Sequence, residues 1–119
     1  MQEPVELSFH GKSLSVLDLK RIAKAKNQGF DKPVTAYLGS AFMNRRSAVG
    51  IIFGDEGEDP FGRFEDGRLF QASGLVSVNK EGRFWVASTE DCRYVIASFK
   101  RVDGRRSLRD FLSRHGGSV

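Results

Sequence analysis

Residues 75–99 read LVSVNKEGRFWVASTEDCRYVIASF, and this stretch decides the expected fold. It contains three apolar runs rich in β-branched and aromatic residues, separated by two groups of residues that favour turns. The runs predict strands over 75–78, 83–88 and 92–99, and the groups between them predict turns over 79–82 and 89–91. Short strands joined by tight turns pair antiparallel, so we expect a meander.

More strands are expected before this stretch, over 5–9, 34–42 and 47–53. Residues 36–46 also fit a helix, but Gly39, Gly50 and the β-branched residues around them favour two strands with a turn at 43–46. Asp66-Gly67 stands between apolar residues and is typical of a tight hairpin turn, because glycine adopts a positive φ at little cost.

Two helices are expected, one near each end of the chain. Ser15 and Asp18 have the spacing of a capping box, which predicts a helix over 16–28. The helical spacing places Val16, Leu19, Ile22 and Ala23 toward the core, and Lys20, Arg21 and Lys24 toward water. Ser107 and Asp110 have the same capping spacing and predict a short helix with Leu108, Phe111 and Leu112 facing inward.

These elements predict an α+β fold in a single domain of 119 residues. We expect a curved antiparallel sheet or a small, partly open β-barrel of about six to eight short strands. One helix in the N-terminal half and one C-terminal helix should cover a face or an end of that sheet. Ten phenylalanines and 39% hydrophobic residues supply enough apolar bulk for its core.

The composition disfavours several classes of protein. No apolar run approaches the ~18 residues of a membrane helix, and the first residues lack the layout of a secretory signal, so we expect no membrane partner and a cytoplasmic location. The single cysteine, Cys92, cannot form an internal disulfide. The acidic residues 55–59 lack the spacing of a calcium loop and no glycine-rich phosphate loop is present, so we expect neither a metal nor a cofactor.

The ingredients of catalysis are sparse. The two histidines, His10 and His115, lie far in sequence from Cys92, so no adjacent base activates this thiol. A histidine with an arginine could form a metal-independent ribonuclease-like site, and Cys92 could be brought near a base by folding. A lone cysteine at the start of a strand is more often a small apolar filler. We therefore expect a protein that is not an enzyme.

Clustered arginines are the most informative polar feature of a chain whose net charge is only +4. The residues expected to contact phosphate are Arg45, Arg46, Arg101, Arg105, Arg106 and Arg109. Cations in the first turn of a helix oppose its dipole, so the arginines at the start of the last helix favour an anion-facing surface. Phe84 or Trp85 could supply a face on which an unpaired base stacks. The alternative interpretation is a solubilising rim.

Two functional hypotheses follow from these patterns. The first is a small, non-enzymatic nucleic-acid-binding accessory protein that contacts phosphate without reading sequence. The alternative is an inhibitor or adaptor, encoded by a phage or other mobile element, that docks on a host protein complex. Its anchors would be Phe61, Phe64 and Phe70, beside the acidic residues Asp55 and Glu56. A homodimer formed through an exposed edge strand is a further possibility.

The spacing Phe64-x-Asp66-Gly67-x-x-Phe70, followed by Ser73, Gly82 and Tyr94, resembles hairpin modules in small proteins of phages and conjugative elements. The resemblance covers about residues 61–99 and names no single family. It implies a mobile-element context and assigns no site residue.

Overall fold

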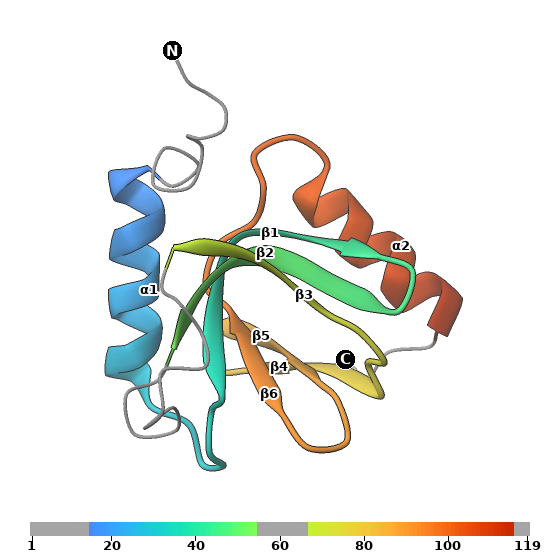
Figure 1. The fold of residues 1–119 in the computed structure, drawn as a ribbon, viewed down its shortest axis with the longest axis horizontal. Helices are drawn as coiled ribbons and strands as arrows, with labels where there is room; N and C mark the ends of the chain where they lie inside the picture. The colour runs from blue at the N-terminus through green and yellow to red at the C-terminus, as the bar shows by residue number, and fades with distance from the viewer. Residues whose placement is uncertain (1–14, 55–66, 116–119) are drawn as a thin grey trace.

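The computed structural model describes residues 15–54 and 67–115 and contains two helices and six strands in these ranges (Figure 1). In chain order the elements are α1 (Val16–Gln28), β1 (Ala36–Asn44), β2 (Ser47–Gly54), β3 (Arg68–Ala72), β4 (Ser77–Glu81), β5 (Phe84–Ser88), β6 (Arg93–Ile96) and α2 (Gly104–His115). The α+β class is confirmed, with one helix in each half of the chain. The expected strand over 5–9 lies outside the described residues.

The six strands form one sheet in the order β3-β2-β1-β6-β5-β4. Within β3-β2-β1 and within β6-β5-β4 all pairs are antiparallel, whereas β1 and β6 pair in parallel. The sheet is therefore mixed rather than purely antiparallel. The parallel pair arises because the chain passes from β3 at one edge to β4 at the other, and then returns to the centre. The sheet is strongly curved (Figure 1), but its described edges β3 and β4 do not pair, so no barrel closes.

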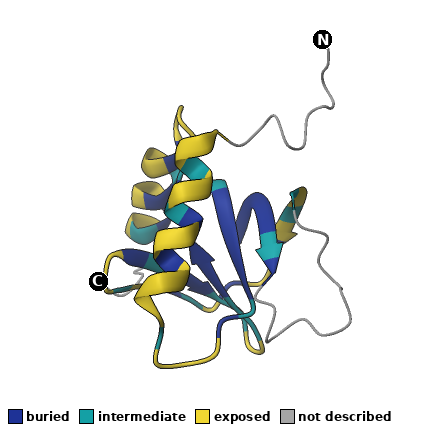
Figure 2. Ribbon diagram, turned by 90° about the vertical axis from the view of Figure 1, so that its left-hand side faces the viewer, coloured by how far each residue is buried: buried dark blue, intermediate teal, exposed yellow. Residues whose placement is uncertain are grey.

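Each helix covers a different face of the sheet. Successive side chains of β6 point to opposite faces of the sheet, as in any β-strand. Tyr94 and Ile96 belong to the hydrophobic cluster on the α2 side, and Val95 belongs to the cluster on the α1 side. Leu108 and Phe111 of α2 pack into the first cluster, as expected. Figure 2 shows the buried strands behind α1, whose outer surface is exposed.

The first helix has the expected bounds, and its capping box between Ser15 and Asp18 is present. The expected inward stripe is only partly correct. Ile22 is buried, but Val16, Leu19 and Ala23 are exposed, and Ala25 is buried in their place. The two buried residues of α1, Ile22 and Ala25, lie at and beyond the middle of the helix.

Other boundaries also differ from the sequence-based expectation, and β6 ends at Ile96, three residues before the expected end at Phe99. Asn79, Lys80 and Glu81 continue β4 instead of forming a turn, because an edge strand with one open face tolerates polar residues. The second helix begins at Gly104, three residues before Ser107. Residues 36–46 form strand and turn, so the helical alternative is wrong. Of the expected Asp66-Gly67 hairpin, Gly67 is described and has φ 88°, and the strand after it pairs with β2.

Neither helix in residues 15–54 and 67–115 has the length and apolarity needed to cross a bilayer.

Candidate anion-binding groove

A bulge in β1 positions the chain that follows β6. The register between β1 and β2 shifts between Gly39 and Phe42, and Ser40 has a positive φ of 50°. Beside this bulge the amide of Ala41 donates to the carbonyl of Ser98 at 3.0 Å, and the amide of Lys100 donates to the carbonyl of Ala41 at 2.8 Å. The segment 98–100 therefore lies along β1 and is held there by backbone hydrogen bonds.

The start of α2 is packed tightly against the same part of β1. Gly104 is buried, and a β-carbon at this position would lie 2.9 Å from the carbonyl oxygen of Ala41, so only glycine permits this approach. One turn later the hydroxyl of Ser107 accepts a hydrogen bond from the amide of Met43 at 2.8 Å. Ser107 thus attaches α2 to the sheet and does not cap the helix. The arginines on this turn of α2, Arg105, Arg106 and Arg109, are exposed.

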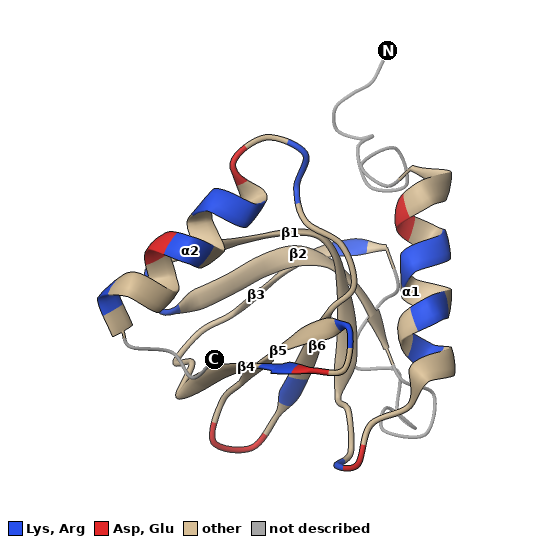
Figure 3. Ribbon diagram, turned by 180° about the vertical axis from the view of Figure 1, so that it is seen from behind, with Lys and Arg blue, Asp and Glu red and all other residues tan. Residues whose placement is uncertain are grey.

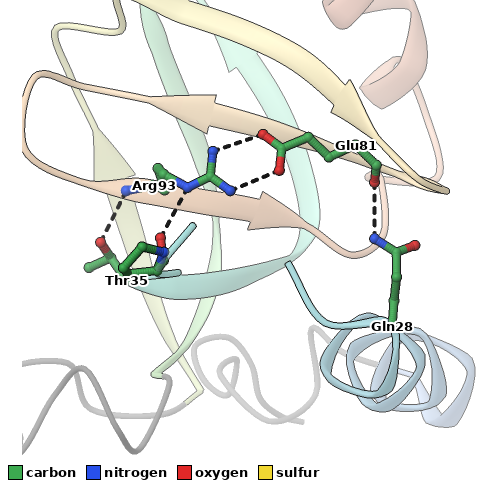
Figure 4. Close-up of polar contacts among 5 residues, drawn as sticks. Gln28, Thr35, Glu81 and Arg93 are labelled. Atoms are coloured by element: carbon green, nitrogen blue, oxygen red, sulfur yellow. Dashed lines mark hydrogen bonds and ion pairs between the residues drawn. The ribbon is translucent and has the colours of Figure 1, made fainter. Parts of the chain in front are cut away.

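The end of α1 is held by a polar network around Glu81 (Figure 4). The side chain of Gln28 donates to the carbonyl of Glu81 and accepts from the amide of Arg83, each at 3.0 Å. The carboxylate of Glu81 binds the guanidinium of Arg93 through two hydrogen bonds of 2.8 Å. Arg93 also donates to the carbonyl of Pro33 at 3.0 Å. This network attaches α1 to the turn between β4 and β5.

The Glu81 and Arg93 side chains stabilise each other's charged forms. The hydrogen bonds from Arg93 lower the pKa of the Glu81 carboxyl, against the opposing effect of burial, and the positive charges of Arg93 and Lys32 lower it further. The hydrogen bonds from Glu81 raise the pKa of the Arg93 guanidinium.

The middle of α1 is attached through Arg21. Its Nε donates to the carbonyl of Ala97 at 3.2 Å, and its guanidinium carbon lies over the ring of Phe84, 5.1 Å from the centroid. The sequence-based expectation that Arg21 faces only water is therefore wrong. A second such pair lies opposite, where the guanidinium of Arg105 covers the ring of Phe99 at 4.7 Å.

Between α1 and the segment 98–109 lies an open groove of about 660 Å³. We call it the basic groove. Its cationic side chains are Arg21, Lys24, Lys100, Arg101, Arg105, Arg106 and Arg109. Figure 3 shows basic segments on α1, on the loop before α2 and on the first turns of α2.

The charge of the basic groove is not balanced by its own carboxylates. Seven cations and two carboxylates, Asp18 and Asp103, line it, which leaves a net charge of +5. The whole chain carries +4, so the rest of the chain carries −1. Asp18 serves in the helix cap. Among the described residues the only ion pair of the groove is Arg106 with Asp103, at 3.7 Å and with both side chains about two-thirds exposed, a geometry that contributes little.

Four of the six predicted phosphate-binding arginines meet in this groove, namely Arg101, Arg105, Arg106 and Arg109. The other two do not. Arg45 lines a separate hollow of about 330 Å³ with Arg114 and His115, near the opposite end of α2. Arg46 follows it in the exposed turn between β1 and β2. The structure therefore brings four of the six arginines together in one groove and places Arg45 in another hollow.

The predicted stacking residues also lie elsewhere. Trp85 is half-buried, packs against the cluster on the α2 side of the sheet and does not line the basic groove. Phe84 is 3% exposed and lies beneath Arg21. Neither ring offers an open face in the groove.

Sequence reasoning did not assign Arg21, Lys24 and Lys100 to a site. Arg21 and Lys24 are three residues apart and therefore lie on one face of α1, and this spacing could have indicated a basic helix face. Nothing in the sequence placed that face opposite α2.

The remaining candidates do not form a second described site. Phe61, Phe64, Asp55, Glu56 and His10 lie outside the described residues. Phe70 is half-buried, with its ring 5.5 Å from that of Tyr94. Cys92 is half-buried against the core, and the ring of His115 lies 4.7 Å from that of Phe111. Within 15–54 and 67–115, no three His, Cys, Asp or Glu residues gather in a metal-binding group.

Comparison of the chain with protein-family models, with curated proteins and with solved structures finds no match. The geometry of the basic groove is therefore the main guide to function.

Proposed function

We propose that this protein is a small, non-enzymatic nucleic-acid-binding accessory protein whose basic groove binds phosphate. The observation that carries the proposal is the concentration of a net charge of +5 in one groove of a chain whose total charge is +4. Segments more than seventy residues apart in sequence, at Arg21 and Arg101, contribute to it. Seven positive charges with only two carboxylates among the described lining residues favour a polyanionic ligand.

The chemistry of the groove fits phosphate oxygens. A guanidinium offers planar, bidentate donors that match phosphate, and four of the seven cations are arginines on or beside the first turns of α2. Contacts of this kind neutralise the nucleic-acid backbone and carry no sequence information. We therefore expect binding that depends strongly on salt and weakly on sequence.

The test is a binding titration of labelled oligonucleotides at 50 to 200 mM salt. If about six phosphate contacts form, the affinity of the wild-type protein falls by roughly 10³ over this range. Replacing Arg101, Arg105 and Arg106 by Gln should weaken binding at every sequence and make the salt dependence shallower by about two to three units of slope.

The matched control replaces Arg45, Arg46 and Arg114 by Gln, which removes the same charge away from the groove. This variant should keep most of the affinity and the slope of the wild type. Equal losses in the two triple variants would show that net charge alone acts, and absence of binding at 50 mM salt would overturn the proposal.

The proposal extends to a cytoplasmic location and to a role in the biology of a phage or other mobile element. The alternative function, docking on a host protein complex, stays a prediction. Its expected anchors are Phe61, Phe64 and Phe70, beside Asp55 and Glu56. One stoichiometric partner that survives nuclease treatment in a pull-down with the full chain would favour that alternative.

A further inference from the structure

The basic groove does not end at Lys24. A second hollow of about 330 Å³ is lined by Arg21, Lys24, Asn27, Gln28, Arg83 and Phe84. It shares Arg21 and Lys24 with the basic groove, so the two hollows adjoin. Arg83, in the turn before β5, brings an eighth cation to this surface.

Both hollows follow one face of α1. The helix contributes positions 17, 18, 21, 24, 27 and 28 to them, a spacing of three and four residues that defines a single stripe. Leu17 and Gln28 are eleven residues apart, which at ~1.5 Å per residue gives a path of about 16 Å. The Gln28 network fixes the far end of this path, because it attaches α1 to the amide of Arg83.

The cations stand on both sides of the path. Arg21 and Lys24 project from α1, and Lys100, Arg101 and Arg105 come from the facing segment. A single sugar-phosphate chain that lies between two basic walls can be contacted from both. A duplex carries its phosphates on the outside of a wide rod, so we expect it to contact fewer of these cations at once than a single strand does.

Two guanidiniums in the path are already fixed on aromatic rings. Arg21 rests over Phe84 and Arg105 over Phe99, and each ring supports the guanidinium from the protein side. Unpaired bases stack on arginine planes as well as on aromatic rings. In this groove the guanidiniums, and not Trp85, are placed to stack on bases.

We propose that the connected hollows along α1 bind one strand of single-stranded nucleic acid, from Arg105 at one end to Arg83 at the other. This proposal rests on the proposed function, and it adds the strandedness of the ligand and the residue that ends the path.

The first experiment compares a labelled 15-nucleotide single strand with the duplex of the same sequence, by anisotropy at 50 mM salt. We expect the single strand to bind at least tenfold more tightly. Equal or tighter binding of the duplex would overturn this inference and leave the proposed function intact. Absence of binding by either ligand would overturn the proposed function itself.

The second experiment tests the path with Arg83→Gln. We expect this change to weaken binding of the 15-nucleotide strand about threefold to fivefold. The control is Lys80→Gln, an equal loss of charge on the exposed edge strand β4. If both variants lose the same affinity for the 15-nucleotide strand, or if Arg83→Gln has no effect on it, the bound strand does not reach the second hollow. Thermal unfolding of both variants checks that neither has lost the fold.

Discussion

The environment of Arg93 and the basic groove show two opposite uses of arginine in the same small protein. The guanidinium of Arg93 is 17% exposed and makes two bonds of 2.8 Å to Glu81 and one of 3.0 Å to a backbone carbonyl. Arg106 in the groove is 71% exposed, and its single carboxylate partner lies 3.7 Å away. The first arginine uses three of its five N–H donors within the protein, whereas the second keeps most of its donors for a ligand.

This difference separates charge that supports the fold from charge that is available for binding. Arg93 and Glu81 join β6 to β4 across β5, and the backbone carbonyl of Glu81 also binds Gln28 at the end of α1. Among the described residues, the contacts of the groove cations within the protein are three ring contacts, one weak ion pair and one hydrogen bond from Arg21. The density of arginines in the sequence does not separate these two uses, but the partners of each side chain do.

The largest effect on stability is expected from Glu81→Gln. It removes the carboxylate charge from two hydrogen bonds with a largely buried guanidinium, so we expect a loss of about 2 to 3 kcal/mol in the free energy of unfolding at pH 7. Chemical denaturation measures this loss. The control Glu90→Gln removes an exposed carboxylate nearby and should change the free energy by less than about 0.5 kcal/mol.

The pH dependence of that difference gives a second readout. Because the pKa of Glu81 is lowered on folding, its contribution is fully present above the ordinary value of 4.5 and is lost as the pH falls through the lower folded value. The difference in the free energy of unfolding between the wild type and Glu81→Gln should therefore be constant from pH 7 to pH 5 and should shrink below pH 4.5. A difference that persists unchanged into strong acid would mean that the carboxylate charge is not responsible.

A smaller effect is expected from Gly82→Ala. Gly82 has φ 64°, and a β-carbon there would lie 2.6 Å from the side-chain amide of Gln28. The change should cost about 1 kcal/mol for the left-handed backbone and a similar amount for the displaced Gln28. Gly74→Ala is the matched control, because Gly74 has φ 74° and open space around it. If the two variants lose equal stability in denaturant titrations, Gln28 does not hold the end of α1.

The fold was predictable from the sequence wherever a local signal determines local structure. Ser15 and Asp18 define the start of α1, and the apolar alternation around Trp85 defines β5. The strand order was not predictable, because the parallel pairing of β1 with β6 joins residues far apart in the chain and no local signal marks the crossing of the chain from β3 to the opposite edge of the sheet. The polar residues of β4 also resembled a turn, since an edge strand needs only one buried face.

The candidate site was predictable only in its local part. Arg101, Arg105, Arg106 and Arg109 lie within nine residues of sequence, so their clustering was evident. Their convergence with Arg21 depends on the β1 bulge, on the close approach at Gly104 and on the packing of α1, and none of these has a clear signal in sequence. Arg45 and Arg46 resembled the others in composition but lie at a different end of α2.

The smallest effect on stability is expected from Arg109→Gln. Whether the free energy of unfolding rises or falls distinguishes an arginine kept for binding from one that supports the fold. Arg109 lies four residues after Arg105 and three after Arg106 on one helix, so like charges face each other, and removing one should raise the free energy of unfolding by about 0.3 to 0.5 kcal/mol. Gln and Arg have similar helix propensities, so propensity does not account for a gain. The gain should shrink as salt screens the repulsion, while the affinity of Arg109→Gln for nucleic acid stays below that of the wild type at every salt concentration.

Arg114→Gln is the matched control. Arg114 lies in the last turn of α2, where a cation interacts favourably with the helix dipole, so its removal should lower the free energy of unfolding. A stability loss in Arg109→Gln as large as that in Arg114→Gln would mean that the groove arginines support the fold.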